Sequence, residues 1–243
     1  MAASIQRKRF IARTKRALRH MMPGHIVKSR VTASMMRRFT DKMGLVYFGT
    51  VHPGDEGSRL VRGHTVSRTH IDNHYSVGSL RGYDVALVMR NDVVLAARAQ
   101  QEFRCHWVIL TVDLHTSLEL PHMYIGHKER EEAFKASFER LSPLYIGGLA
   151  PYPAHFLSEY TVYGNAGCLF DIERTVPPQA AKVIAEHFDN ASIEIEENTI
   201  YLYIESARPT EAQIEKLLSN GLWLAETIDT NASALYCEVP EKQ

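Results

Sequence analysis

The first 22 residues have the spacing of an amphipathic helix, with an apolar arc opposite a basic one at about 100° per residue. The apolar arc holds Phe10, Ile11, Ala17, Leu18, Met21 and Met22. The basic arc holds Lys8, Arg9, Arg13, Lys15, Arg16, Arg19 and His20. Pro23-Gly24 is expected to end this helix. A second helix is predicted over Ala33–Met43, with Thr32 as its N-cap and Gly44 just past its end.

From Gly44 onward the period changes to that of strands. Strands are predicted over Leu45–Val51, Val61–Val66, His74–Leu80, Tyr83–Met89 and Phe103–Leu114. Arg81-Gly82 is typical of a hairpin turn, and Asn91-Asp92 is expected to mark the next turn. The charged stretch that opens His127–Leu141, followed by Ala133, Phe134 and Phe138 at helical spacing, predicts a helix.

A compact α/β pattern follows a segment that is rich in Pro and Gly. That segment, residues 143–153, is a loop or a hinge between subdomains, and the pattern leaves both open. The elements predicted after it are a strand over Glu159–Tyr163, a helix from Pro177-Pro178 through Phe188, a hairpin of Ser192–Glu196 and Thr199–Ser206, and a helix over Thr210–Leu224 capped by Thr210.

Together these elements predict an α+β protein. Its body, residues 44–243, is expected to be β-rich and mostly antiparallel with a few helices. A basic helical arm, residues 1–43, precedes the body.

Charge is distributed unevenly although the net charge is zero. Residues 1–40 carry eleven Lys and Arg and no acidic residue, whereas the remaining 203 carry 17 basic and 28 acidic residues. A basic arm on an acidic body indicates an anionic partner. No apolar run approaches the roughly 18 residues that span a membrane. The three cysteines, Cys105, Cys168 and Cys237, lack the spacing of a disulfide scaffold or a zinc ribbon.

Three hypotheses compete for the arm. It lies on an anionic membrane surface, it binds nucleic acid phosphates, or it packs its apolar arc on the body. The docking hypothesis assigns electrostatic attraction and apolar insertion to Lys8, Arg9, Phe10, Ile11, Arg13, Lys15, Arg16, Leu18, Arg19, Met21 and Met22. Under the docking hypothesis, the protein is expected to be non-enzymatic and cytoplasmic, and to lie at the inner face of the membrane. Its body is expected to bind another protein.

The order of elements in residues 74–206 resembles an uncharacterised bacterial family, domain of unknown function three-one-three-seven. The resemblance rests on an aromatic-x-Val-Tyr strand within Phe156–Tyr163, a helix opened by Pro177, and a hairpin ending in Leu202-Tyr203-Ile204. It implies an α+β body and supplies no activity and no site residues. The two N-terminal membrane helices common in that family are replaced here by the basic arm.

Twelve histidines offer one candidate metal site. His64, His70, Asp72 and His74 lie close in sequence, and the last three would share one face of an extended strand. Two imidazoles and a carboxylate suit zinc or a non-haem metal. A metal-dependent enzyme is therefore the alternative function, while the plain interpretation is a polar surface strand that needs no cofactor.

Two further pairs carry weaker chemical signals. Cys105 and His106 would point to opposite faces of a strand, so Cys105 is expected to be a small buried residue beside Trp107 rather than a nucleophile. Asp113 and His115 could form an acid–base pair at a strand end, or simply lie at the surface. The sequence contains no phosphate-binding glycine loop and no nucleophile-elbow motif.

Overall fold

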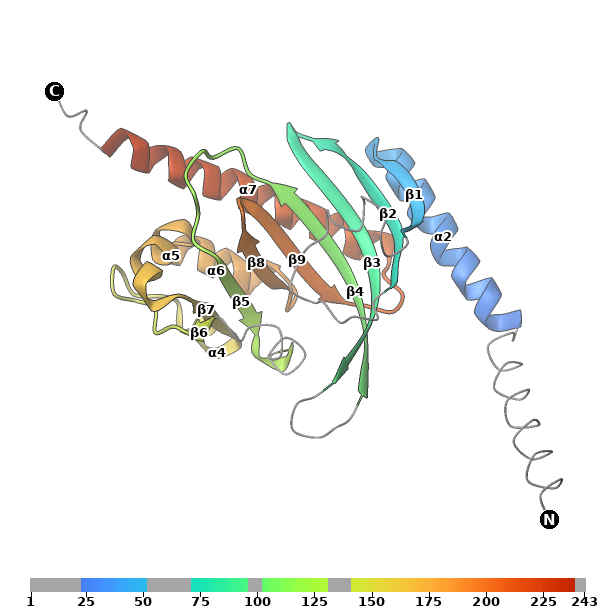
Figure 1. Ribbon diagram of the computed structural model, residues 1–243, viewed down its shortest axis with the longest axis horizontal. Helices are drawn as coiled ribbons and strands as arrows, with labels where there is room; N and C mark the ends of the chain where they lie inside the picture. Colours follow the sequence, from blue (N-terminus) through green and yellow to red (C-terminus); the bar gives the residue numbers. More distant parts are fainter. Residues whose placement is uncertain (1–22, 52–70, 96–101, 131–140, 239–243) are drawn as a thin grey trace, which may run out of the picture.

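The computed structural model describes residues 23–51, 71–95, 102–130 and 141–238. Its strands form one antiparallel sheet in the order β1-β2-β3-β4-β9-β8-β5-β7-β6 (Figure 1). The strands are β1 Val46–Val51, β2 Ile71–Leu80, β3 Tyr83–Leu95, β4 Glu102–Asp113, β5 Met123–His127, β6 Ser142–Pro143, β7 Tyr160–Gly164, β8 Ser192–Glu196 and β9 Thr199–Glu205. The predicted α+β class with a mostly antiparallel sheet is confirmed.

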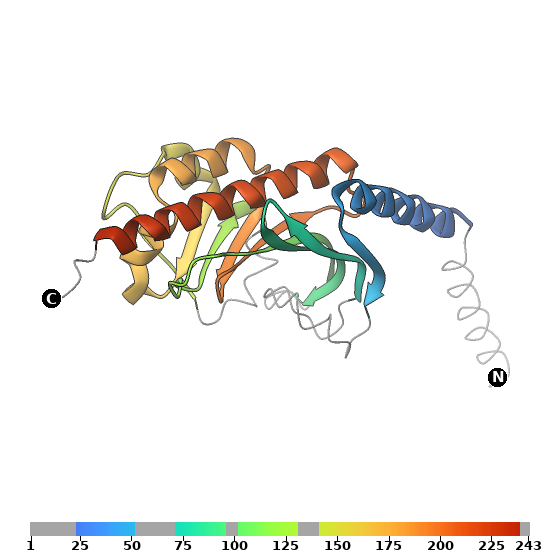
Figure 2. The same cartoon turned by 90° about the horizontal axis from the view of Figure 1, so that it is seen from above.

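The helices pack on one face of this sheet. They are α2 Pro23–Met43, α4 Ala154–Glu159, α5 Leu169–Thr175, α6 Pro178–His187 and α7 Glu211–Glu238, with short 3-10 turns η2 Lys128–Arg130 and η3 Ala166–Cys168. Buried residues of α2, α4, α5, α6 and α7 join the main hydrophobic core with the inward residues of the strands. A second, smaller hydrophobic cluster contains no helical residue within the described ranges. Figure 2 shows α2 and α7 above the sheet, whose other face we call the open face.

Both predicted hairpins are confirmed. Arg81 and Gly82 have φ values of 51° and 89°, and Glu197 and Asn198 have φ values of 49° and 56°. Positive φ at both central residues gives the turn that matches the twist of the flanking strands.

The turn predicted at Asn91-Asp92 is wrong. β3 continues past it, with Asn91 opposite His106 and Asp92 opposite Cys105 on β4. Asn91 Oδ1 and His106 Nδ1 lie 2.6 Å apart across the two strands, so the polar side chain has a cross-strand partner instead of starting a turn.

The second predicted helix needs correction. α2, Pro23–Met43, includes the residues before Ala33, and Thr32 lies within it instead of capping it. The expected end at Gly44 is confirmed: Gly44 has φ 73°, and Leu45 N donates to Thr40 O at 2.8 Å.

The helix predicted from His127 is wrong at its start. His127 is the last residue of β5, and all five residues of that strand are buried. A short apolar strand buried on both faces has no alternation for the pattern to detect. Residues 131–140 of the predicted helix, the predicted strand Val61–Val66 and the amphipathic segment before Pro23 lie outside the described residues.

The elements after the Pro-rich segment agree with the sequence more closely. Thr210 caps α7, since Gln213 N donates to Thr210 Oγ1 at 3.2 Å and Thr210 N donates to Gln213 Oε1 at 2.9 Å. α7 runs on to Glu238, well beyond the predicted end at Leu224, and the short helices α4 and α5 were not predicted.

The Pro-rich segment is held by one carboxylate. Glu173 of α5 is 2% exposed and accepts the backbone N–H groups of Gly147, Gly148 and Leu149 at 2.6, 2.9 and 2.7 Å. Burial alone would raise the pKa of Glu173, but the three N–H donors favour its charged form more and hold the pKa below its usual value.

Gly221 brings α7 into close contact with the sheet. A Cβ atom at this position would lie 2.6 Å from Leu110 Cδ2 and 3.0 Å from Leu202 Cδ1. Both leucines are buried in the core, so the space that a side chain would need is already filled.

Changing Gly221 to Val should therefore lower the free energy of unfolding by about 1–3 kcal/mol, the usual cost of overpacking a core. Urea denaturation measures the change. Ser219→Val, on an exposed position of the same helix, is the matched control and should change stability little. Equal destabilisation by the two substitutions would show that α7 does not press on the sheet at Gly221.

Candidate functional site

The open face of the sheet carries rows of side chains that the strand register places side by side. Val77 of β2 pairs with Ala86 of β3, Ala86 with Thr111 of β4, and Thr111 with Tyr201 of β9. Tyr201 stacks on Tyr203 two residues along, with ring centroids 6.5 Å apart and planes within 11°. These residues belong to or contact the smaller hydrophobic cluster, apart from Thr111.

A groove of about 640 Å³ lies over these rows. We call it the open-face groove. Its lining includes Tyr75, Val77, Ser79, Asp84, Ala86, Thr111, Asp113, Glu197, Thr199 and Tyr201. Three of these side chains are carboxylates, and no Lys, Arg or His is among the described residues of the lining. The groove therefore has a negative potential at one end and aromatic side chains further along.

Tyr75 is a buried polar residue in the lining of the groove. Its side chain is 4% exposed, and its hydroxyl is buried without a hydrogen bond to any part of the chain that the structure describes. Burial raises the pKa of Tyr75, and the nearby charge of Asp113 raises it further, so the hydroxyl keeps its proton. A buried polar group without a partner is uncommon in folded proteins.

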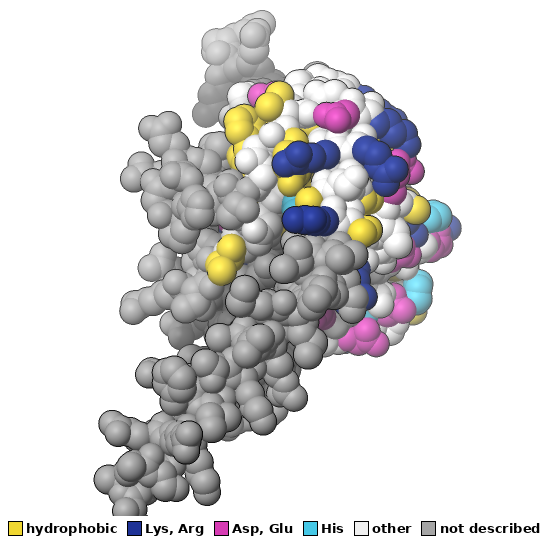
Figure 3. Space-filling view, turned by 90° about the vertical axis from the view of Figure 1, so that its right-hand side faces the viewer, with side chains coloured by type: hydrophobic (Ala, Val, Ile, Leu, Met, Phe, Trp, Pro, Cys, Tyr) yellow, Lys and Arg dark blue, Asp and Glu magenta, His cyan; other side chains and the backbone are white. Residues whose placement is uncertain are grey.

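A second surface lies at the β1 end of the sheet. Exposed Arg30, Arg37 and Arg38 lie on α2, and exposed apolar side chains also occur on α2 and β1. The apolar ones are Val31 at 64%, Val46 at 56% and Phe48 at 61% exposed. Figure 3 shows basic and apolar side chains mixed on this side of the molecule. We call these six residues the basic edge.

Arg37 also has a structural contact within the basic edge. Its guanidinium carbon lies 5.2 Å from the centre of the Tyr47 ring on β1. The Tyr47 hydroxyl in turn lies 2.7 Å from His74 Nδ1. Burial lowers the pKa of His74, and the charge of Arg37 lowers it further. Neutral His74 therefore links β2 to Tyr47 of β1.

Asp72 and His74, the two predicted metal ligands that the structure describes, are not brought together. Both side-chain oxygens of Asp72 are bound by Arg90, with Nε to Oδ1 at 2.7 Å and Nη2 to Oδ2 at 2.8 Å. His74 is bound to Tyr47 instead. The pairing of β2 is irregular between Asn73 and Ser76, which breaks the alternation that would have placed Asp72 and His74 on one face. His64 and His70 lie outside the described residues.

Another group has the composition of a metal site. Among the described residues, one group of three side chains could hold a metal ion: His122, Glu194 and Glu196. His122 Nε2 lies 3.0 Å from Glu194 Oε1, and Tyr203 donates its hydroxyl proton to Glu194 Oε2 at 2.7 Å. An imidazole and two carboxylates suit zinc or manganese. The strict alternation of Ser192–Glu196 indicates that Glu194 and Glu196 share a face, but nothing in the sequence links them to His122.

His122 also offsets the charge of Glu194 without any metal. Glu194 is fully buried, and an isolated buried carboxylate is costly. Burial lowers the pKa of His122, but the hydrogen bond and the charge of Glu194 raise it more, so the net pKa lies above the usual value.

The two weaker sequence signals have different outcomes. Cys105 is 5% exposed in the cluster with Trp107, as expected for a small buried residue. Asp113 and His115 have separate partners: Asp113 accepts a hydrogen bond from Thr199 at 2.9 Å, and His115 stacks on Tyr83 with ring centroids 4.3 Å apart. Asp113 and His115 therefore do not form an acid–base pair, and both are exposed, as the alternative of surface residues expected.

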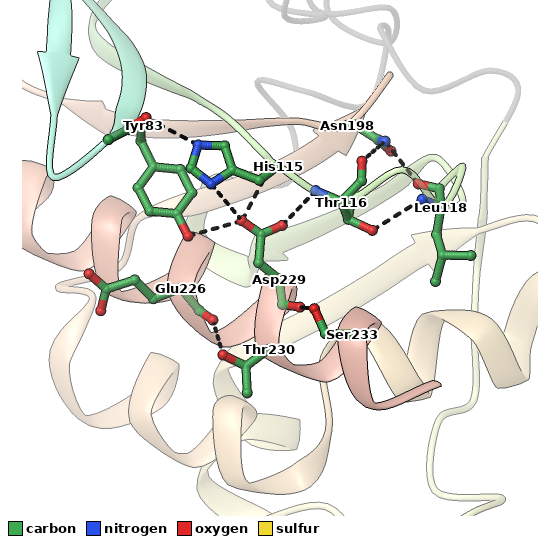
Figure 4. Close-up of polar contacts among 10 residues, drawn as sticks. Tyr83, His115, Thr116, Leu118, Asn198, Glu226, Asp229, Thr230 and Ser233 are labelled. Atoms are coloured by element: carbon green, nitrogen blue, oxygen red, sulfur yellow. Dashed lines mark hydrogen bonds and ion pairs between the residues drawn. The ribbon is translucent and has the colours of Figure 1, made fainter. Parts of the chain in front are cut away.

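Asp229 of α7 is the carboxylate nearest His115, and Figure 4 shows it among its contacts. It accepts the Tyr83 hydroxyl at 2.9 Å and the backbone N–H groups of His115 and Thr116 at 3.1 and 2.9 Å. His115 Nδ1 is 3.9 Å away, beyond hydrogen-bond distance. Asp229 therefore ties α7 to the start of β3 and to the segment after β4.

Comparison with known proteins supports the fold. No protein-family model matches the chain, and no curated protein matches it. A solved structure, the mycobacterial trehalose monomycolate transport factor A, TtfA, superimposes with a TM-score of 0.54 at 15% identity. The match covers 83% of this chain and 94% of that one. At this identity the likeness establishes the fold, and the resemblance to domain of unknown function three-one-three-seven stays a prediction.

Changing His122 to Gln tests the charge pairing, because Gln keeps a donor and loses the positive charge. A raised pKa in the folded state stabilises the protein below the unfolded pKa of about 6.5, and this contribution disappears as the pH rises through the folded pKa. We expect a deficit of about 1.5–3 kcal/mol under acidic conditions that shrinks toward alkaline pH.

Urea denaturation at a series of pH values measures this deficit. His187→Gln, which changes an exposed histidine of α6, serves as the control and should show little dependence on pH. A deficit of His122→Gln that stays constant across the series would contradict the pairing.

Proposed function

We propose that this protein acts at an anionic membrane surface as a non-enzymatic factor in a lipid-related process. The basic edge and the basic segment that precedes it in sequence dock on the membrane, and the body engages a second protein. The observation that carries the proposal is the basic edge, where α2 and β1 together expose three arginines and three apolar side chains.

The chemistry of the basic edge fits a membrane surface. Each Lys or Arg near an anionic leaflet contributes about 1 kcal/mol of attraction. Val31 and Phe48 are large apolar side chains that solvent would otherwise contact, and insertion between headgroups buries them. Arg19, Arg16, Lys15 and the apolar residues Met21 and Met22 come shortly before α2 in the sequence, so they extend the same composition.

The structural comparison supports the lipid-related part of the proposal. The mycobacterial protein of the same fold is a trehalose monomycolate transport factor. In the described part of this chain, no helix is long and apolar enough to cross a membrane. Attachment through a surface segment is the mode of membrane association that the proposal uses.

Co-sedimentation of the full chain with vesicles tests the proposal. Arg30→Gln combined with Arg38→Gln removes two charges and leaves Arg37 on Tyr47. We expect strong binding to vesicles that contain phosphatidylglycerol, weaker binding with added salt, and a loss of about 30-fold in affinity for the double variant, from about 2 kcal/mol.

Arg174→Gln combined with Lys182→Gln is the matched control, because it removes two exposed charges from α5 and α6. It should keep most of the vesicle binding. Equal loss in both variants, equal binding to neutral vesicles, or tighter binding to duplex DNA at the same salt concentration would contradict membrane docking.

A further inference from the structure

His122, Glu194 and Glu196 are brought together by the pairing of β5 with β8. Glu194 and Glu196 share one face of β8, because side chains alternate along a strand. Met123 of β5 pairs with Ile195 of β8, so His122, the residue just before β5, lies at the level of Glu196. This register places an imidazole beside two carboxylates that are distant from it in sequence.

The imidazole has one carboxylate near each of its nitrogens. His122 Nε2 is 3.0 Å from Glu194 Oε1, and His122 Nδ1 is 3.9 Å from Glu196 Oε1. One ligand atom from each of the three side chains lies within 4.8 Å of the others. Neighbouring ligands of a tetrahedral zinc ion are about 3.3–3.6 Å apart, because each bond to zinc is about 2.0–2.2 Å long. Small rotations of the side chains therefore suffice to bring the three atoms onto one ion.

The charge and burial of the three groups favour a cation. Two carboxylates lie beside a single imidazole, so the combined charge of the three groups is negative even when the imidazole is protonated. Glu194 is fully buried, whereas the side chains of His122 and Glu196 are 28% and 30% exposed. The buried carboxylate would anchor an ion, and the two partly exposed side chains leave solvent a path to it.

Tyr203 of β9 orients the buried carboxylate. Its hydroxyl donates to Glu194 Oε2 at 2.7 Å, while Glu194 Oε1 faces His122. The Tyr203 side chain is 1% exposed, so packing fixes the position of the donor. Hydrogen bonds of this kind to a ligand carboxylate are a regular part of metal sites, because they hold the ligand in its binding orientation.

We propose that His122, Glu194 and Glu196 bind one Zn²⁺ ion. The ion takes one ring nitrogen and one oxygen from each carboxylate, and water completes its coordination. It joins the segment before β5 to β8. The imidazole favours zinc over magnesium, which prefers oxygen ligands and retains its own water molecules. The three residues lie outside the basic edge, so the site goes beyond membrane docking and does not depend on it.

A metal site and a plain ion pair differ in what they need from Glu196. An ion pair is complete with His122 and Glu194, whose atoms are already at hydrogen-bond distance. Glu196 Oε1 is 3.9 Å from the imidazole, beyond that distance, so it adds little to such a pair. In a zinc site Glu196 is one of three ligands. Removing its charge therefore separates the two accounts.

Isothermal titration of the full chain with zinc chloride, after dialysis against a chelator, tests the proposal. We expect zinc to bind with a Kd of about 10 μM or tighter, and Mg²⁺ to bind at least about a hundredfold more weakly. Glu196→Gln and, separately, His122→Gln should each weaken zinc binding by about tenfold or more, because each removes a ligand. Zinc should also raise the melting temperature of the unchanged protein, because it binds the folded chain.

Glu186→Gln combined with His187→Gln is the matched control. It removes an imidazole and a carboxylate that lie 4.0 Å apart on α6, and it should keep zinc binding within about twofold. The melting temperature of each metal-free variant shows whether it is folded. The proposal is overturned if zinc does not bind at about 1 mM, if Mg²⁺ binds as tightly, if Glu196→Gln binds zinc as well as the unchanged protein, or if the control loses as much affinity as Glu196→Gln.

Discussion

The close packing of α7 across the sheet is the contact on which the rest of the structure depends. At Gly221 the helix backbone approaches Leu110 and Leu202 so closely that no Cβ atom would fit. Ile214, Leu217 and Leu224 extend the contact along the helix, and all are buried. Asp229 then fixes α7 to Tyr83 and to the segment after β4. One long helix thus holds strands that lie far apart in the sequence.

This packing divides the sheet into two unlike faces. The helix-covered face holds the main core, whereas the polar and titratable groups of the strands gather on the open face: the ion pair of Asp72 and Arg90, the cluster of His122 and Glu194, and the carboxylates of the open-face groove.

Much of this fold could be predicted from local patterns, because hairpins and caps depend on neighbouring residues. The turns at Arg81-Gly82 and Glu197-Asn198 and the cap at Thr210 follow from local chemistry. The candidate sites could not be predicted from local patterns, because the residues that form them are brought together by strand register. An irregularity in β2 separates Asp72 from His74. His122 and Glu194 come together through pairing of β5 with β8.

We propose that the membrane contacts the basic edge and that α7 stays packed against the sheet when the protein binds. Hydrogen–deuterium exchange of the full chain, with and without anionic vesicles, tests it most directly. Binding should slow exchange at amides of α2 and β1, between Arg30 and Phe48, and leave the amides of α7 from Ile214 to Asp229 unchanged. Slowed exchange along α7, or no change in α2 and β1 when the vesicles bind, would contradict the account.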